Sequence, residues 1–321
     1  MKDILIGMAV GDACGVPHEF KPKVTMDMYP ATDMIGGGTH GQVKGTWSDD
    51  TSMALCIVES LLNGLNYSDM INKFTDWLRG GYWTPHGVVF DNGISTRRAI
   101  DRWRTGQFLP ADCGGTTDGS NGNGSVMRTL VLVPYIEHLD IDQRWAIIST
   151  TSSLTHAHWI SRFSCLLACE FAIEMRKKNK KLVTRRDAWD DAVVTVRGIR
   201  NKTIAETDEF TEEEFDKYFG EYLFEDAPYT LKDEDYRGSG FARDTAVTAI
   251  YCVLTTSSYK EAVLKAINYG DDTDTTACVT GGLAGIIYGV DGIPKDWVDC
   301  IARKDDILDL VERYEALYEV V

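Results

Sequence analysis

Apolar residues recur every three or four positions through most of the chain, which is the spacing of helices that bury one face. The sequence lacks the runs of alternating apolar and polar residues joined by hairpin turns that indicate β-sheets. The helical period predicts helices at about 51–64, 68–79, 94–104, 142–152, 158–178, 185–199, 241–254, 259–269, 275–289 and 305–319. We therefore expect an all-α fold.

Two long, glycine-rich loops interrupt this pattern, "GGGTHGQ" at 36–42 and "CGGTTDGSNGNGS" at 113–125. Loops of such length are usually functional or disordered. A third segment, 206–236, is rich in acids but keeps aromatic residues, so we expect an ordered insertion or subdomain there. Because no internal repeat or low-complexity tract divides the chain, we treat 1–321 as a single domain that carries this insertion.

The charge and the hydropathy of the chain limit its partners. The formal net charge is −16 at pH 7, and thirteen acids against two lysines fall within 206–236. A negative surface repels phosphate, which argues against nucleic acid as the main partner. No apolar run reaches the ~18–20 residues of a membrane span, and the N-terminal residues turn acidic too early for a signal peptide. We expect a cytoplasmic, monomeric protein that does not associate with membranes.

Two clusters of acids and hydroxyls begin predicted helices, "SDDTS" at 48–52 and "DDTDTT" at 271–276. Asp, Ser and Thr are favoured helix caps, but one acid and one hydroxyl are enough for a cap, and adjacent carboxylates repel each other. A divalent cation removes this conflict, since carboxylate and hydroxyl oxygens are the ligands that Mg²⁺, Mn²⁺ and Ca²⁺ prefer. The pattern leaves two interpretations open: separate caps, or a shared two-ion site where both helix ends meet.

The helix that follows the second cluster contains three glycines, Gly281, Gly282 and Gly285. Each lowers helix stability by about 1 kcal/mol relative to alanine. We therefore expect another helix to approach this one closely.

Six motifs in order resemble the ADP-ribosylglycohydrolase family over nearly the whole chain. They are "GMAVGDACGVPHEF", "GTWSDDTSMA", "DNGISTRRAI", "GNGSVMR", "LTHAHW" and "GDDTDTTACVTGGLAG". Each motif alone is weak, but six in sequence are specific. The resemblance implies a compact, orthogonal multi-helix bundle with two Mg²⁺ or Mn²⁺ ions at the base of a cleft. The implied metal ligands are Ser48, Asp49, Asp50, Asp272, Asp274 and Thr275.

The resemblance also implies roles in substrate binding and catalysis. Glu19 corresponds to a catalytic or substrate-gating glutamate, Asp91 to an acid that assists opening of the ribose ring, and Asp49 is a further candidate for the general base. Ile94 departs from the polar residue that some relatives have there. The implied binding residues for the diphosphate and ribose are Gly119, Ser120, Asn121, Gly122, Asn123, Gly124, Ser125, Met127 and His156.

The implied activity is metal-dependent hydrolysis of the glycosidic bond between ADP-ribose and a modified protein side chain. We expect arginine as the modified residue, because the sequence looks closer to the bacterial relatives. One alternative is a hydrolase for another ADP-ribosyl or N-ribosyl compound, whether serine-linked, on nucleic acid or a small molecule. Another is a non-catalytic relative of the crystallin type.

Overall fold

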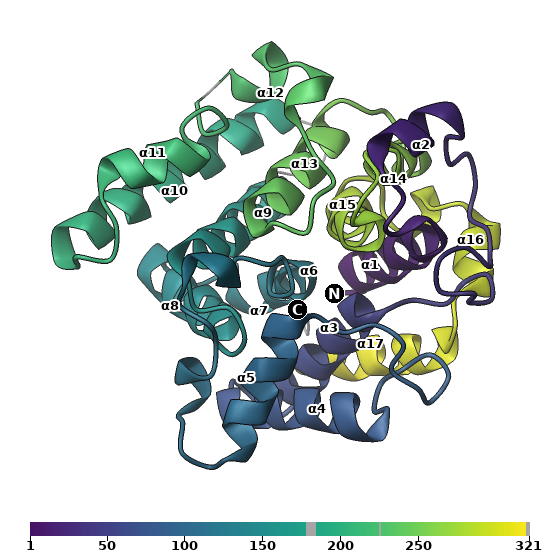
Figure 1. The fold of residues 1–321 in the computed structure, drawn as a ribbon, viewed down its shortest axis with the longest axis horizontal. Coiled ribbons are helices and arrows are strands. Elements are labelled where there is room, and N and C mark those ends of the chain that lie inside the picture. The colour runs from purple at the N-terminus through teal and green to yellow at the C-terminus, as the bar shows by residue number, and fades with distance from the viewer. Residues whose placement is uncertain (178–183, 225, 319–321) are drawn as a thin grey trace.

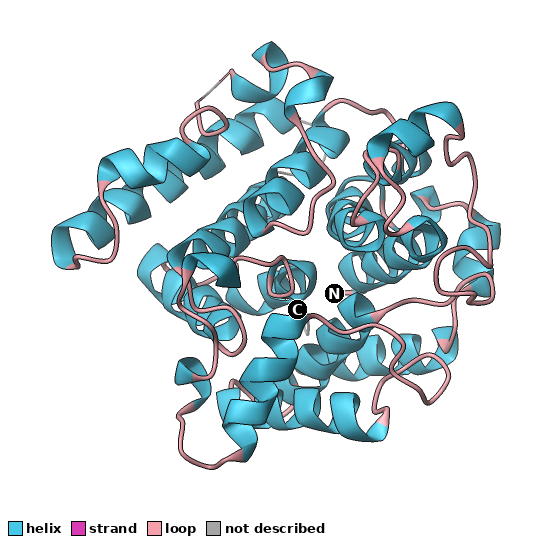
Figure 2. Ribbon diagram, viewed as in Figure 1, coloured by secondary structure: helices cyan, strands magenta, loops and turns pink. Residues whose placement is uncertain are grey.

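The computed structural model describes residues 1–177, 184–224 and 226–318. Within these ranges the chain forms helices joined by loops, and the extended backbone is limited to isolated bridges (Figure 2). The prediction of an all-α fold is confirmed. Each predicted helix is present, while the expected ends at 178 and 319 lie outside the described residues.

The centre of the molecule is a pair of tightly packed helices, α1 (Lys2–Gly15) and α15 (Thr273–Tyr288) (Figure 1). A Cβ atom on Gly281 would lie 2.2 Å from the carbonyl oxygen of Gly7, and one on Gly285 would lie 2.0 Å from that of Asp3. Only glycine permits backbones to approach so closely. The close helix approach expected from the glycines of α15 is therefore confirmed.

The remaining long helices surround this pair. On one side lie α3, α4, α5 and α17, and on the other α13 and α14 cover α15, while α9 packs between α8, α10 and α13 (Figure 1). Their bounds are α3 (Asp49–Leu61), α4 (Tyr67–Gly80), α5 (Ile94–Arg104), α8 (Ile141–Ser153), α9 (Trp159–Lys177), α10 (Arg185–Glu206), α13 (Ala242–Leu254), α14 (Tyr259–Ile267) and α17 (Lys304–Tyr318).

Short helices connect these elements. The α-helical ones are α2 (Lys23–Met28), α6 (Val126–Thr129), α7 (Val133–Ile136), α11 (Glu212–Phe219), α12 (Ala227–Thr230) and α16 (Lys295–Cys300). The 3₁₀ turns are η1 (Val16–His18), η2 (Pro110–Asp112), η3 (Asp118–Ser120), η4 (Leu130–Leu132), η5 (Asp233–Asp235) and η6 (Val290–Gly292).

The acidic segment 206–236 is attached to the bundle through aromatic rings. Phe210 stacks on Trp159 of α9 at a centroid distance of 4.6 Å, and Phe215 stacks on Phe219 at 4.9 Å. These phenylalanines are buried although the acids around them are exposed.

Among the described helices, none combines the length and the apolarity that a membrane span needs.

Candidate active site

The amino ends of α3 and α15 meet, although their sequences are more than 200 residues apart. The hydroxyl of Thr275 donates a hydrogen bond to Asp50 Oδ1 over 3.3 Å, and both side chains are buried. The two acid clusters therefore lie next to each other, as a shared site would require.

Asp12, from α1, organises the beginning of α3. Its carboxylate accepts hydrogen bonds from the backbone N–H of Ser48 at 2.9 Å and from the N–H and hydroxyl of Thr51 at 3.1 and 2.6 Å. Full burial, opposed by these hydrogen bonds, raises the pKa of Asp12 to about 7. Ser48 is the cap of α3 and accepts from the N–H of Asp50 at 3.3 Å. Capping needs are thus met by Asp12 and Ser48.

The other carboxylates have oxygens that the protein leaves without partners. Asp50 Oδ2 and Asp272 Oδ1 are buried and accept no hydrogen bond from the described residues. Burial, followed by the charges of neighbouring acids, raises the pKa values of Asp49, Asp50 and Asp274 well above the ordinary range. An unpaired buried carboxylate is expensive, so this arrangement favours a bound cation.

Two of the acid groups have ligand atoms close enough to share one ion. Atoms of Glu19, Asp272 and Asp274 lie within 4.8 Å of one another, and so do atoms of Asp12, Asp50 and Cys278. All of these residues except Cys278 offer carboxylate oxygens, which suits a hard divalent cation. The residues present therefore fit a divalent metal.

A cavity of about 360 Å³ opens at the two clusters. Most of the predicted site residues line it: Glu19, Asp49, Asp50, Asp91, Gly119, Gly122, Asn123, Gly124, Met127, His156, Asp272 and Thr275. The remaining predicted residues are not part of its lining: Ser48, Ser120, Asn121, Ser125 and Asp274.

One wall of the cavity is acidic. Burial, and then the charges of Asp91, Asp272 and other carboxylates, raises the pKa of Glu19 to about 10. Glu19 Oε2 forms a short hydrogen bond with His40 Nε2. Burial likewise raises the pKa of Asp91. Glu19 can therefore hold a proton at neutral pH, where an ordinary carboxyl group cannot.

Another part of the lining comes from the second glycine-rich loop, 113–125. Asn123 donates from its amide to Asp272 Oδ2 at 3.0 Å and to the hydroxyl of Thr245 at 2.9 Å, which joins the loop to the second acid cluster. The other predicted polar side chains of the loop bond to the protein itself: Ser120 to Thr117, Asn121 to Asp118 and Ser161, and Ser125 to Ser152. The part of the loop that faces the cavity is mainly backbone.

His156 lies against Gly122 and Gly124 of this loop and also lines the cavity. Its Nδ1 lies 2.7 Å from the hydroxyl of Thr155, and burial, with the positive charge of Arg128, lowers its pKa to about 3. The imidazole is thus neutral. Arg128 is buried, does not line the cavity, and donates to the carbonyl oxygen of Gly124 and to Thr155 at 2.7 Å. These contacts give Arg128 a structural role behind the loop.

Sequence reasoning missed several residues of the site. Phe20, Thr96 and Gly240 line the cavity, and His40 contacts Glu19. His40 lies in the first glycine-rich loop, whose length was the only signal, while Phe20 directly follows Glu19 in a motif that drew attention to the acid alone.

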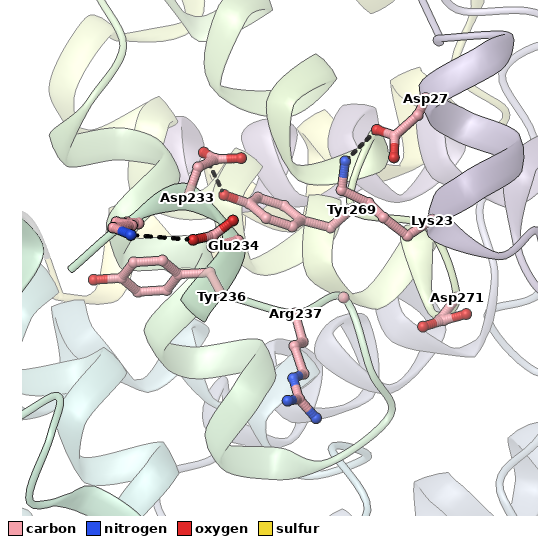
Figure 3. A pocket seen from close by; sticks show the side chains of 10 residues that line it. Lys23, Asp27, Asp233, Glu234, Tyr236, Arg237, Tyr269 and Asp271 are labelled. Carbon is pink, nitrogen blue, oxygen red and sulfur yellow. Dashed lines mark hydrogen bonds and ion pairs between the residues drawn. The ribbon is translucent and has the colours of Figure 1, made fainter.

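A larger cavity of about 680 Å³ is lined by residues of α2, of the segment 232–238 and by Tyr269 and Asp271 (Figure 3). Its charges are largely neutralised from within. Tyr269 donates to Asp233 at 2.8 Å, Lys23 pairs with Asp27, and Lys232 lies 3.4 Å from Glu234. Because none of its lining side chains has a buried oxygen without a partner, we do not place the chemistry there.

Comparison with known proteins gives concordant matches. The family model described as ADP-ribosylglycohydrolase matches residues 1–321. The chain is 31% identical to an ADP-ribosylarginine hydrolase of Pseudomonas putida (strain GB-1), over 97% of this chain and 76% of the relative. It is 26% identical to the ADP-ribosyl-[dinitrogen reductase] glycohydrolase of Rhodospirillum rubrum, over 93% of this chain and 89% of the relative.

A solved structure agrees with these matches. A protein described as an ADP-ribosylglycohydrolase-related protein complex superimposes with a TM-score of 0.75 and 26% identity, over 98% of this chain and 96% of the other. The resemblance drawn from the six motifs is confirmed. The chain belongs to the ADP-ribosylglycohydrolase family and is a hydrolase of that class.

Proposed function

We propose that the protein hydrolyses the bond between ADP-ribose and a modified arginine side chain, with two Mg²⁺ or Mn²⁺ ions in the cleft. The observation that carries the proposal is the meeting of two acid clusters whose buried oxygens, Asp50 Oδ2 and Asp272 Oδ1, lack partners. Arginine is supported by the similarity to a relative named as an ADP-ribosylarginine hydrolase.

The proposed ligands come from both helix ends. They are Ser48, Asp49, Asp50, Asp272, Asp274 and Thr275. When bound, the ions would orient the ribose hydroxyls and stabilise charge as the glycosidic bond breaks. Ser48 and Asp274 already serve their helices, through the Asp50 N–H at 3.3 Å and the Thr275 N–H at 2.9 Å, and each keeps oxygen lone pairs for a further partner.

The acidic residues of the cavity are the candidates for proton transfer. Glu19 and His40 share a hydrogen bond, so a proton can pass between Glu19 Oε2 and His40 Nε2. We propose Glu19 as the general base that activates water, in the ionised form that bound cations would favour over the protonated form expected without them, with Asp49 as the alternative, and Asp91 as the group that protonates the leaving side chain. Arginine is a poor leaving group until it carries a proton, which is why the raised pKa of Asp91 suits this role.

The glycine-rich loop would bind the diphosphate and ribose. Backbone N–H groups of the glycines that line the cavity, Gly119, Gly122 and Gly124, can bind phosphate oxygens without adding a charge, as glycine-rich loops do. The neutral imidazole of His156 would complete this part of the lining. No lysine or arginine lines the cavity among the described residues, so phosphate binding would depend on backbone dipoles and bound cations.

A parallel assay tests this proposal. Release of ADP-ribose is measured from peptides modified on arginine or serine and from modified nucleic acid, with Mg²⁺, with Mn²⁺ and with a chelator. We expect release from the arginine peptide that depends on a divalent ion. Release from another substrate alone would move the assignment to that linkage, and no turnover on any of them would support a non-catalytic role.

A further inference from the structure

Phe20 has a conformation that packing does not explain. Its backbone lies in the left-handed region, with φ of 63°, and the residue is 65% exposed. A side chain with a Cβ loses free energy in this region, on the order of 1 kcal/mol, and an exposed ring recovers little by burial. Such outliers often mark ligand contacts.

Backbone hydrogen bonds fix this conformation. The N–H of Phe20 donates to the carbonyl oxygen of Asp271 at 2.6 Å, and the hydroxyl of Thr39 donates to the carbonyl oxygen of Glu19 at 2.6 Å. The residue that follows, Lys21, accepts from the N–H of Asp271 at 2.7 Å. Phe20 is therefore held in place between the first motif and the second acid cluster, and its ring lines the 360 Å³ cavity.

Next to Phe20 lie two further aromatic side chains, His40 and Phe90, which are not part of the cavity lining. The centroids of Phe20 and His40 are 5.8 Å apart, and those of His40 and Phe90 are 5.2 Å apart. Ligand atoms of Glu19, His40 and Asp91 lie within 4.8 Å of one another. Rings next to carboxylates are a setting for a cation, because the ring faces and the acids both attract positive charge.

We propose that Phe20 binds the guanidinium group of the acceptor arginine and thereby selects arginine over uncharged acceptors. This inference rests on the proposed function, in which the second glycine-rich loop binds ADP-ribose and leaves the part of the cavity next to Phe20 for the acceptor. A guanidinium group is planar and stacks on aromatic faces, whereas a serine acceptor offers neither charge nor a flat surface. No cationic side chain of the described cavity lining competes for this position.

The test compares matched variants of the full chain with Mg²⁺ present. Phe20→Leu removes the ring and keeps a side chain, and Phe20→Tyr restores a ring. Tyr29→Leu is the control, because Tyr29 is an aromatic residue that is 75% exposed and lines neither cavity. For each variant, kcat and KM are measured on arginine-linked and serine-linked ADP-ribosyl peptides, and calorimetry gives the Kd for agmatine at saturating ADP-ribose.

We expect Phe20→Leu to lower kcat/KM on the arginine peptide about tenfold, mainly through KM, and to weaken agmatine binding several-fold. Activity on the serine peptide, affinity for ADP-ribose and the melting temperature should stay unchanged, and Phe20→Tyr should retain most of the arginine activity. An equal loss on both peptides, or no loss, would overturn the proposal. If the original protein does not cleave the arginine peptide, the proposed function fails, while agmatine binding still decides whether Phe20 recognises a guanidinium group.

Discussion

The two carboxylate oxygens of Asp50 have different surroundings in the site. Its Oδ1 accepts a hydrogen bond from Thr275, but its Oδ2 is buried without a partner next to other carboxylates. In the metal-free protein this negative charge opposes folding. With a cation bound, the same charge favours folding, because the ligand binds the folded state alone.

Asp50→Asn should therefore have opposite effects in the two states. The folded-state pKa of Asp50 is raised, so its carboxylate destabilises the metal-free protein above the ordinary pKa. With a chelator at pH 8, we expect the variant to be about 2 kcal/mol more stable, from relief of an unsatisfied buried group. Mn²⁺ should raise the melting temperature of the original protein and leave that of the variant unchanged. Equal stabilisation of both by Mn²⁺ would contradict the ligand role of Asp50.

His156 gives a second residue-level prediction, with the opposite pH dependence. Its folded-state pKa is about 3, below the ordinary value near 6.5, so between these values the unfolded chain binds a proton that the folded chain does not. Stability contributed by the neutral imidazole is complete above pH 6.5 and is lost as the pH falls toward 3. At pH 5 the loss should be about 2 kcal/mol, from 1.36 kcal/mol per pH unit.

Urea unfolding of the original protein and of His156→Gln at pH 7.5 and pH 5 measures this term. The difference in unfolding free energy between the two proteins should shift by about 2 kcal/mol against the original protein at the lower pH. His138→Gln, at an exposed histidine, is the control for the substitution itself. A constant difference for His156→Gln would mean that the buried imidazole titrates normally.

At the scale of elements, the α1–α15 pair determines where the acid clusters lie. Gly281 lets the two backbones approach, and Asp12 of α1 then reaches the first turn of α3. The site therefore depends on the spacing of three helices. A substitution that changes this spacing should therefore destabilise the fold even if every proposed metal ligand is kept.

Two glycine substitutions separate packing from helix propensity. Gly281→Ala places a Cβ 2.2 Å from the carbonyl oxygen of Gly7, so we expect a loss of about 3 kcal/mol or more in unfolding free energy. Gly198→Ala, within α10, meets no atom within 4 Å and should stabilise the protein by up to about 1 kcal/mol. Denaturant unfolding of both variants checks the pair. Similar effects at the two positions would show that the close approach in the centre is not tight in solution.

The exposure of each helix explains which parts of the fold the sequence can predict. Helices with one exposed face, such as α4 and α5, show a clear period and were expected close to their observed bounds. The helix α1 is buried on nearly all sides, so its apolar residues have no polar face to alternate with, and periodicity alone did not predict it. Helix-forming tendency was visible, but the partner of each helix was not.

The site, like the fold, could be predicted from the sequence only in part. Acid clusters at 48–52 and 271–276 were recognisable because their local charge exceeds what capping requires. The contact between Asp50 and Thr275, the position of Asp12 behind Ser48, and the pairing of His40 with Glu19 depend on tertiary packing. No local pattern records such contacts, so they had to come from the structure.

At the scale of the whole molecule, the acidic segment 206–236 raises the question of what its charge does. Part of that charge is neutralised by the bundle: Arg200 lies 3.2 Å from Glu212 and 3.1 Å from Asp216, and Lys265 lies 2.9 Å from Asp233. Exposed ion pairs contribute little each, about 0–1 kcal/mol. The buried rings of the segment are the larger contribution to stability, which favours a covering role over docking of a basic partner.

Two variants of this segment distinguish covering from docking. Phe215→Ala removes a ring that is 1% exposed and stacked on Phe219, so the unfolding free energy should fall by about 3–4 kcal/mol. The triple change Glu206→Gln, Asp208→Asn and Glu213→Gln removes exposed charge and should leave stability within about 0.5 kcal/mol. If the segment only covers the bundle, the triple variant should also cleave an ADP-ribosylated protein at the original rate in both low and high salt. A rise in KM for the modified protein at low salt alone, with small modified peptides unaffected, would instead assign the segment to partner docking, because only long-range attraction between exposed charges is screened in that way.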